Sequence, residues 1–150
     1  MHAAITAAIG FLIAVLWFDL MFDVQLISRD DAAPDAAAVE SIATYYQRVT
    51  TDASPMGRLV GLVMVVLFTL LVAQAVRDGT PAWVSISSLV GAGAAIVLAL
   101  TRVVPNAVRL GARKDPPDTR AALAHGILRD HLVFLSLMVA VLVVQLVGGT

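Results

Sequence analysis

Asp19 and Asp23 stand four residues apart near the end of the first apolar stretch of the chain. In a helix this spacing places both carboxylates on one face. Asp19 lies several residues inside the apolar run, where an unpaired carboxylate is costly. We therefore expect its side chain to be paired, protonated or turned toward a wet cavity, and a carboxylate in a cavity can act as a general base.

Basic and amide side chains follow at the end of the third apolar stretch. Arg102, Asn106 and Arg109 fall on one helical face, at spacings of four and three residues. Pro105 lacks an N–H and clashes with the preceding turn, so a kink is expected there. The carbonyl groups freed by the kink need polar neighbours, which Asn106 or Arg102 would supply.

Two imidazoles precede and open the last apolar stretch. His125 and Arg129 share a helical face, whereas Asp130 and His131 point about 100° apart. His125 and His131 therefore make a poor chelate on one helix. No tight spacing such as H-E-x-x-H is present, so no metal ligands are predicted, and the sequence does not identify a cofactor.

These polar groups have two main interpretations. In the first, either aspartate forms ion pairs with Arg102 or Arg129 and fixes the register of the helices. In the second, the groups line a pocket in which an imidazole carries a proton, Asp19 is the base and Arg102 anchors an anion. A metal site built from both aspartates and both imidazoles is a further alternative, which the spacing disfavours. The candidate catalytic residues are Asp19, Arg102, Asn106, His125 and His131.

Four long apolar stretches position these residues. They cover residues 3–26, 56–76, 82–104 and 132–147, and about 20 such residues span a bilayer as a helix. The first connection holds a further pattern at residues 35–50, where apolar residues recur at helical spacing. We expect an amphipathic helix there, which lies in the membrane interface or caps the bundle, with a mobile gate as the alternative.

These elements predict an all-α integral membrane protein. Its fold would be a single four-helix transmembrane domain, residues 1–150, with an interfacial amphipathic helix in the first connection. The composition agrees, because 14% of the residues are charged and 59% are hydrophobic, whereas soluble domains are about 25% charged. The net charge of −1 argues against a nucleic-acid partner. So small a bundle is expected to form a homo-oligomer in contact with the lipid bilayer.

The basic residues predict an orientation. Nine of the ten Lys and Arg residues flank or lie in the connections after the first and third stretches, and only Arg77 lies on the opposite side. By the positive-inside rule, both long connections are predicted to be cytoplasmic and both termini external. The Ala-, Val-, Arg- and Asp-rich composition favours the inner (plasma) membrane of a bacterium.

Local signals mark helix starts and helix contacts. Hydroxyl–proline pairs at 54–55 and 80–81 place an N-cap before a proline at the first helical position. Small residues at a spacing of four let helix backbones approach, and we expect them to pack within the bundle rather than to form a dimer face. They are Gly57 and Gly61 in the second stretch and Ser87, Gly91 and Ala95 in the third.

The order of these features resembles a family of small four-helix membrane proteins that includes the anthrone oxygenases. The matching segments are Tyr45–Val49 with Pro55, Val104–Asn106, and His125 with Arg129. Together they cover most of the chain by architecture. The resemblance implies an oxygenase-like activity on a hydrophobic, aromatic small molecule at the membrane.

Three functions are compatible with the sequence. The first is a non-enzymatic polytopic membrane protein, an oligomer or accessory subunit whose polar groups are structural. The second is a membrane-embedded oxygenase-like enzyme that acts on a hydrophobic substrate. The third is an oligomeric channel or transporter, whose path would follow a symmetry axis, because the second and fourth stretches carry few polar residues at the bilayer centre.

Overall fold

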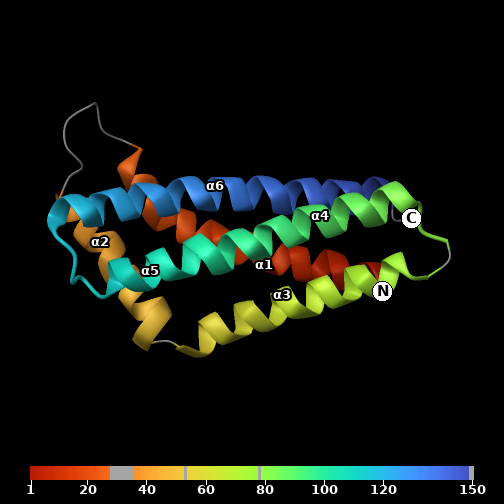
Figure 1. Cartoon of the computed structure of the whole chain (residues 1–150), viewed down its shortest axis with the longest axis horizontal. Coiled ribbons are helices and arrows are strands. Elements are labelled where there is room, and N and C mark those ends of the chain that lie inside the picture. The colour runs from red at the N-terminus through yellow and green to blue at the C-terminus, as the bar shows by residue number, and fades with distance from the viewer. Residues whose placement is uncertain (28–35, 53, 78, 149–150) are drawn as a thin grey trace.

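The computed structural model describes residues 1–27, 36–52, 54–77 and 79–148. Regular structure in these ranges is entirely helical, as predicted (Figure 1). In chain order the elements are α1 (His2–Asp23), the 3₁₀ turn η1 (Val24–Leu26), α2 (Ala36–Gln47), the π-helical turn η2 (Arg48–Asp52), α3 (Ser54–Ala75), α4 (Ala82–Leu98), the π-helical turn η3 (Ala99–Val103), α5 (Val104–Gly111) and α6 (Pro117–Gly148).

Four continuous helical segments are long and apolar enough to cross a membrane, which confirms the predicted fold class. They are His2–Leu26, Pro55–Ala75, Ala82–Gly111 and Pro117–Gly148. The last two exceed the length of about 20 residues that a bilayer core requires. Both therefore extend beyond it, and the extra turns carry the polar residues of one end of the bundle.

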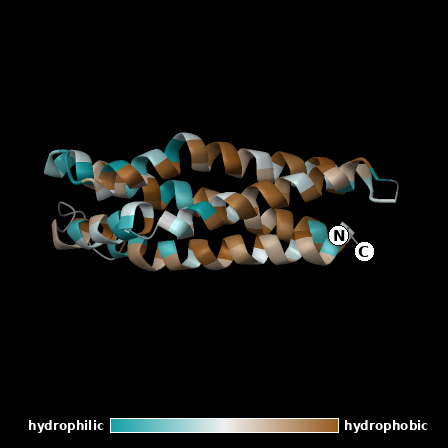
Figure 2. Ribbon diagram, turned by 90° about the horizontal axis from the view of Figure 1, so that it is seen from below, coloured by the Kyte–Doolittle hydropathy of each residue, from teal (hydrophilic) through white to brown (hydrophobic). Residues whose placement is uncertain are grey.

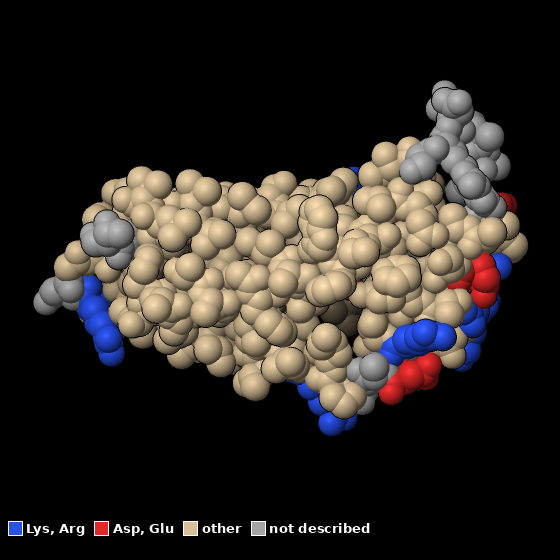
Figure 3. Space-filling view, turned by 180° about the vertical axis from the view of Figure 1, so that it is seen from behind, with Lys and Arg blue, Asp and Glu red and all other residues tan. Residues whose placement is uncertain are grey.

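The two ends of the bundle differ in composition. Both termini lie at one end, and α2 lies across the other, which we call the α2 end (Figure 1). Hydrophilic segments gather at the α2 end, whereas apolar residues predominate along the rest of the helices (Figure 2). Charged side chains of both signs cover the surface of the α2 end (Figure 3). The helices therefore combine a lipid-soluble body with one polar end.

Two apolar cores follow this division. The larger lies between the membrane helices and includes Ile9, Leu71 and Met138, which are almost fully buried. The smaller lies at the α2 end, where Ile42 and Tyr46 of α2 pack against Ile127 and its neighbours on α5 and α6. Helix α2 thus forms within the range predicted to be amphipathic and caps the bundle. Residue 35, the predicted start of that helix, and Arg29 lie outside the described residues.

The expected irregularity at Pro105 takes the form of a π-helical turn. The turn η3 comes immediately before α5, and Pro105 is the second residue of α5. A proline cannot donate to the carbonyl four residues back, and such turns commonly occur where the regular ladder is interrupted. The helix continues through the turn, so α4, η3 and α5 form one long segment.

Glycines show which helix faces meet. A Cβ atom at Gly91 would lie 2.6 Å from Val141, so the backbones of α4 and α6 approach closely there, as the small-residue pattern predicted. A Cβ atom at Gly57 or Gly61 would meet nothing within 4 Å. The prediction that these two glycines pack within the bundle is wrong, because their face of α3 points away from the other described helices.

The predicted cap of the third apolar stretch is also corrected. Helix α4 begins at Ala82 with Pro81 at the N-cap position, and no side chain makes a capping hydrogen bond there. The hydroxyl of Thr80 was predicted to make one. The fixed φ of Pro81 starts the helix without it, because a proline is already close to helical geometry.

Candidate functional site at the α2 end

Helix α2 turns its tyrosines toward the carboxylates of α1. The Tyr46 hydroxyl donates to Asp23 Oδ1 at 2.9 Å and approaches Oδ2 at 3.1 Å. Nδ1 of His131, on α6, lies 2.7 Å from Asp23 Oδ2. All three side chains are at least 97% buried. A buried carboxylate needs hydrogen-bonding partners, and Asp23 receives one from each of two neighbouring helices.

A second phenol–carboxylate pair lies beside the first. The Tyr45 hydroxyl donates to Asp19 Oδ1 at 2.6 Å. The Tyr45 ring stacks on Phe22, with ring centroids 4.0 Å apart and an interplanar angle of 11°. Successive tyrosines on α2 therefore contact the two aspartates that share a face of α1. Asp19 is paired, as the cost of an unpaired carboxylate required, but its partner is a phenol.

The arginines pair with a different carboxylate from the predicted one. Arg102 Nε, in η3, donates to Asp130 Oδ2 at 2.9 Å, and Asp130 is buried. Arg129 Nε lies 3.7 Å from Asp130 Oδ1. The predicted ion pairs of Asp19 or Asp23 with these arginines are therefore wrong in their acidic partner. Asp130 is next to His131 in the chain. Through these two residues, α6 contacts η3 and α1 respectively.

The phenols act as donors over the whole physiological pH range. Burial raises the pKa of Tyr46 far above its ordinary value of 10.0, and the adjacent Asp23 charge raises it further. Burial and the Asp19 charge likewise raise the pKa of Tyr45. Both groups thus stay protonated, and their hydrogen bonds to the carboxylates persist.

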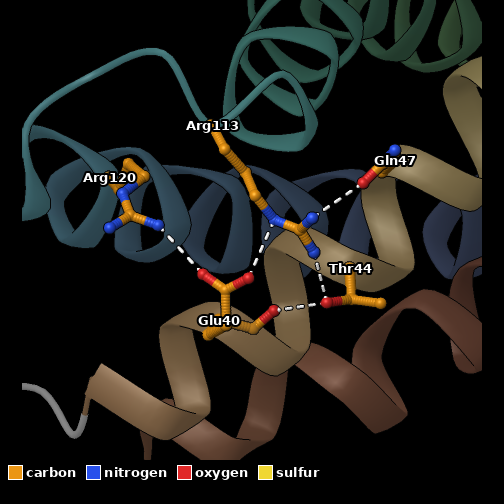
Figure 4. Close-up of polar contacts among 5 residues, drawn as sticks. All are labelled: Glu40, Thr44, Gln47, Arg113 and Arg120. Carbon is orange, nitrogen blue, oxygen red and sulfur yellow. Dashed lines mark hydrogen bonds and ion pairs between the residues drawn. The ribbon is translucent and has the colours of Figure 1, made fainter.

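Two arginines from later in the sequence, Arg113 and Arg120, hold the outer face of α2 (Figure 4). Glu40 forms an ion pair with Arg113, whose Nε lies 2.9 Å from Oε1, and accepts a hydrogen bond from an Nη atom of Arg120 at 3.0 Å. Arg113 also donates to Gln47 Oε1 at 2.8 Å and to the Thr44 hydroxyl. The guanidinium of Arg113 therefore contacts three residues on one face of α2, because positions 40, 44 and 47 are neighbours on a helix.

The backbone around Arg113 is shaped for this contact. A Cβ atom at Gly111, the last residue of α5, would lie 2.7 Å from the Gln47 backbone nitrogen. Only a glycine permits so close an approach of α5 to α2. Arg113 has a φ of 54°, in the left-handed region that is unfavourable for a residue with a side chain. Its contacts with α2 offset that cost.

Two of the predicted site residues stand outside this group. His125 is exposed and Asn106 is partly exposed. The part of the chain that the structure describes gives neither a side-chain partner. No three His, Asp or Glu side chains among the described residues are arranged to hold a metal ion. The structure thus brings Asp19, Arg102 and His131 to the α2 end in paired form, and leaves His125 and Asn106 apart.

Sequence reasoning missed the residues that complete the group. Tyr45 and Tyr46 were assigned to an amphipathic helix without a role for their hydroxyls, and Asp130 was not among the candidates. The available signal was a pair of tyrosines on a helix predicted to cap a bundle end that holds two intramembrane carboxylates. Buried tyrosines need a partner for the hydroxyl, and those carboxylates were the acceptors at hand.

A separate polar cluster lies among the membrane helices, which we call the Gln cluster (Gln74, Ser88 and Gln145). Gln145 Nε2 donates to Gln74 Oε1 and to Ser88 Oγ, both at 2.9 Å. Gln74 Nε2 donates back to Gln145 Oε1 at 3.2 Å. All three side chains are buried. The cluster joins α3, α4 and α6, and no sequence argument had predicted it.

The fold and these contacts define a polytopic α-helical membrane protein whose polar end is closed by α2. The model of the SHR3 chaperone family, described as ER membrane protein SH3, matches residues 1–148. The chain therefore belongs to that family. No curated protein and no solved structure matches it.

The family assignment corrects two predictions. The resemblance to the anthrone oxygenase family is wrong. It depended on the order of the helices and on short Pro-Asn and His-Arg elements, whereas the model of another family matches residues 1–148. The predicted compartment, the inner membrane of a bacterium, is also wrong, since the family is one of ER membrane proteins. Residue composition does not distinguish these bilayers.

Proposed function

We propose that this protein is a membrane-embedded chaperone that shields the apolar helices of client membrane proteins while they fold. The family match over residues 1–148 supports a chaperone role. The client class follows from the build of the chain. Outside the four membrane helices, the described residues form chiefly α2, which is itself packed against the bundle. Client contact is therefore expected on the surfaces of the membrane helices.

The observation that carries this proposal is the exposure of α3. In the most apolar window of this helix, 11% of the residues are buried, against 28% to 33% in the other three membrane helices. Among its described side chains, only the stripe of Leu67, Leu71 and Gln74 is buried. A helix that contributes so little to its own bundle has most of its surface free for another helix.

The outward surface of α3 is suited to close helix contact. Gly57 and Gly61 leave the backbone uncovered, and Leu62 and Val65 beside them are about 60% exposed. Lipid chains are as apolar as leucine, so helices associate in membranes chiefly through close packing of such surfaces. Contacts of this kind are weak enough to be released, which a chaperone requires of its client complexes.

The test is suppression of client aggregation with the full chain in lipid vesicles. A polytopic membrane protein is diluted from denaturing detergent into vesicles with or without the chaperone, and the aggregated fraction is measured by sedimentation. We expect the wild type to lower that fraction. Gly61→Ile should reverse most of the effect, because the added side chain keeps client backbones away from α3.

The matched control is Gly10→Ile on α1. A Cβ atom at Gly10 also meets nothing within 4 Å, so both substitutions add the same side chain to an open surface of a membrane helix. Equal loss of activity in the two variants would show that α3 is not the client surface. Absence of any effect of the wild type on several clients would contradict the chaperone role itself.

A further inference from the structure

The Gln cluster lies where the least buried membrane helix meets the rest of the bundle. Gln74 continues the buried stripe that begins with Leu67 and Leu71, one residue before α3 ends. Its two partners, Ser88 and Gln145, belong to α4 and α6, which pack tightly against each other near Gly91. The last turn of α3, the least buried membrane helix, thus makes a polar contact with the closely packed pair α4 and α6.

We propose that Gln145 and Ser88 form a binding site for the hydrogen-bonding side chain of a client membrane helix, and that Gln74 occupies this site when no client is bound. This inference rests on the proposed chaperone function and names the clients that it favours. They are membrane helices with an amide or hydroxyl side chain near one end. Such helices have the greatest need of protection, because an unpaired polar group in lipid is costly.

The chemistry of the site fits that ligand. The carboxamide of Gln145 both donates to and accepts from Gln74, with N–O distances of 2.9 and 3.2 Å. A glutamine or asparagine of another helix offers the same donor and acceptor, and a serine or threonine offers both through one oxygen. Exchange of Gln74 for such a group therefore preserves the hydrogen bonds of Gln145. An apolar side chain would leave them unmade.

The position of Gln74 permits the exchange. Val76, just beyond the end of α3, is 79% exposed, and interhelical hydrogen bonds in membranes are individually weak. Helix ends are also the parts that open most easily. A client helix that packs beside the end of α3 can thus displace its last turn from Gln145 and Ser88 while the contacts of Leu67 and Leu71 remain.

The experiment uses two synthetic membrane helices and the full chain in phosphatidylcholine vesicles. Both helices are Leu/Ala sequences of about 20 residues. One carries a single glutamine in its last turn, and the other has leucine there. Binding is measured by fluorescence transfer to a chain labelled at Val147→Cys, because position 147 is 71% exposed and the sequence has no other cysteine. We expect the wild type to bind the glutamine helix about three- to ten-fold more tightly.

Two variants separate a client site from a purely structural tie. Gln145→Leu should remove the preference, so that both helices bind alike. Gln74→Leu should strengthen binding of the glutamine helix, because it removes the internal competitor and keeps Gln145 and Ser88. A structural tie predicts the same change in both variants, and that result would overturn the proposal. Ser88→Ala, which keeps the Gln74–Gln145 pair, should reduce the preference without abolishing it.

A distance measurement checks displacement directly. Spin labels at positions 76 and 147 should move apart when the glutamine helix is added and stay in place with the leucine helix. If both helices bind equally well to the wild type, the site proposal fails while the chaperone role stands. If neither helix binds and clients still aggregate, the chaperone role fails as well.

Discussion

The helices α2 and α3 follow one another in the chain but contact the rest of the molecule in different ways. Helix α2 has 12 residues and is held on two sides, by the aspartates of α1 and His131 on its inner face and by Arg113 and Arg120 on its outer face. Helix α3 has 22 residues. Among the described residues, its side chains make polar contacts with other helices only in the Gln cluster.

The difference follows from the surroundings of each helix. Outside the bilayer, an exposed polar face loses little in water, so a short helix needs many specific partners to stay in place. Inside the bilayer, the hydrogen bonds within a helix keep it formed, and lipid covers any apolar face. Helix α3 therefore stays folded without being held closely. We infer that the fixed part of this molecule is its polar end and the adaptable part is its membrane surface.

The largest expected effect is on the ionisation of the phenols. The chain has two tyrosines, and both are on α2. Since their pKa values are raised in the folded protein, they contribute stability that is fully present below about pH 10, the ordinary phenol value, and is lost as the pH rises further. Phenolate absorbance should thus be absent from the folded protein somewhat above pH 10 and appear on unfolding. Titration near the ordinary value would show that α2 is not docked.

The next largest effect is expected from Asp23→Leu. The change leaves the His131 imidazole and the Tyr46 hydroxyl buried without their acceptor, which should cost about 3–5 kcal/mol of unfolding free energy, measured by detergent denaturation in mixed micelles. Gln74→Leu on α3 is the comparison, with an expected cost of about 0.6 kcal/mol. Similar costs for the two variants would contradict the contrast between α2 and α3.

A smaller effect is expected from Gly111→Ala. Its added methyl group would lie 2.7 Å from the Gln47 backbone nitrogen, so α5 and α2 must move apart, at a cost of about 1–3 kcal/mol. Gly126→Ala on α6 is the control, because a Cβ atom there meets nothing within 4 Å. It should instead stabilise the helix by up to about 1 kcal/mol. Phenolate titration would reveal whether only the Gly111 variant releases α2.

The helices themselves could be predicted from the sequence, because a membrane helix is specified by its own residues. Apolar length indicated four helices able to cross a membrane, Pro105 indicated the irregular turn, and apolar spacing indicated α2. The failures concern partners from different helices. Asp19 was expected to meet an arginine at the same depth, but depth does not specify which face of which helix is opposite. Helix rotation decides that Arg102 meets Asp130 and that Asp19 meets a tyrosine.

The predicted catalytic roles of Asp19, Arg102, Asn106, His125 and His131 stay predictions, because no observation bears on them directly. What the structure adds is that the first two and His131 each have a partner at the α2 end. The family could not be inferred from these residues either. Charged and polar residues are common where membrane helices leave the bilayer. Their presence therefore does not identify a family.

The two-sided attachment of α2 also has a consequence for the order of events during synthesis. Asp19 and Asp23 precede α2 by fewer than 30 residues, with separations of 26 and 23 positions for the tyrosine contacts. Gln47 and Arg113 are 66 positions apart, Glu40 and Arg120 are 80, and Tyr46 and His131 are 85. The chain is synthesised from its N-terminus. The contacts of α2 with α1 can therefore form first, and those with α6 form only after α6 has been synthesised. Completion of the α2 end thus follows synthesis of the first part of α6, whereas the contacts of Gln145 in the Gln cluster form later still.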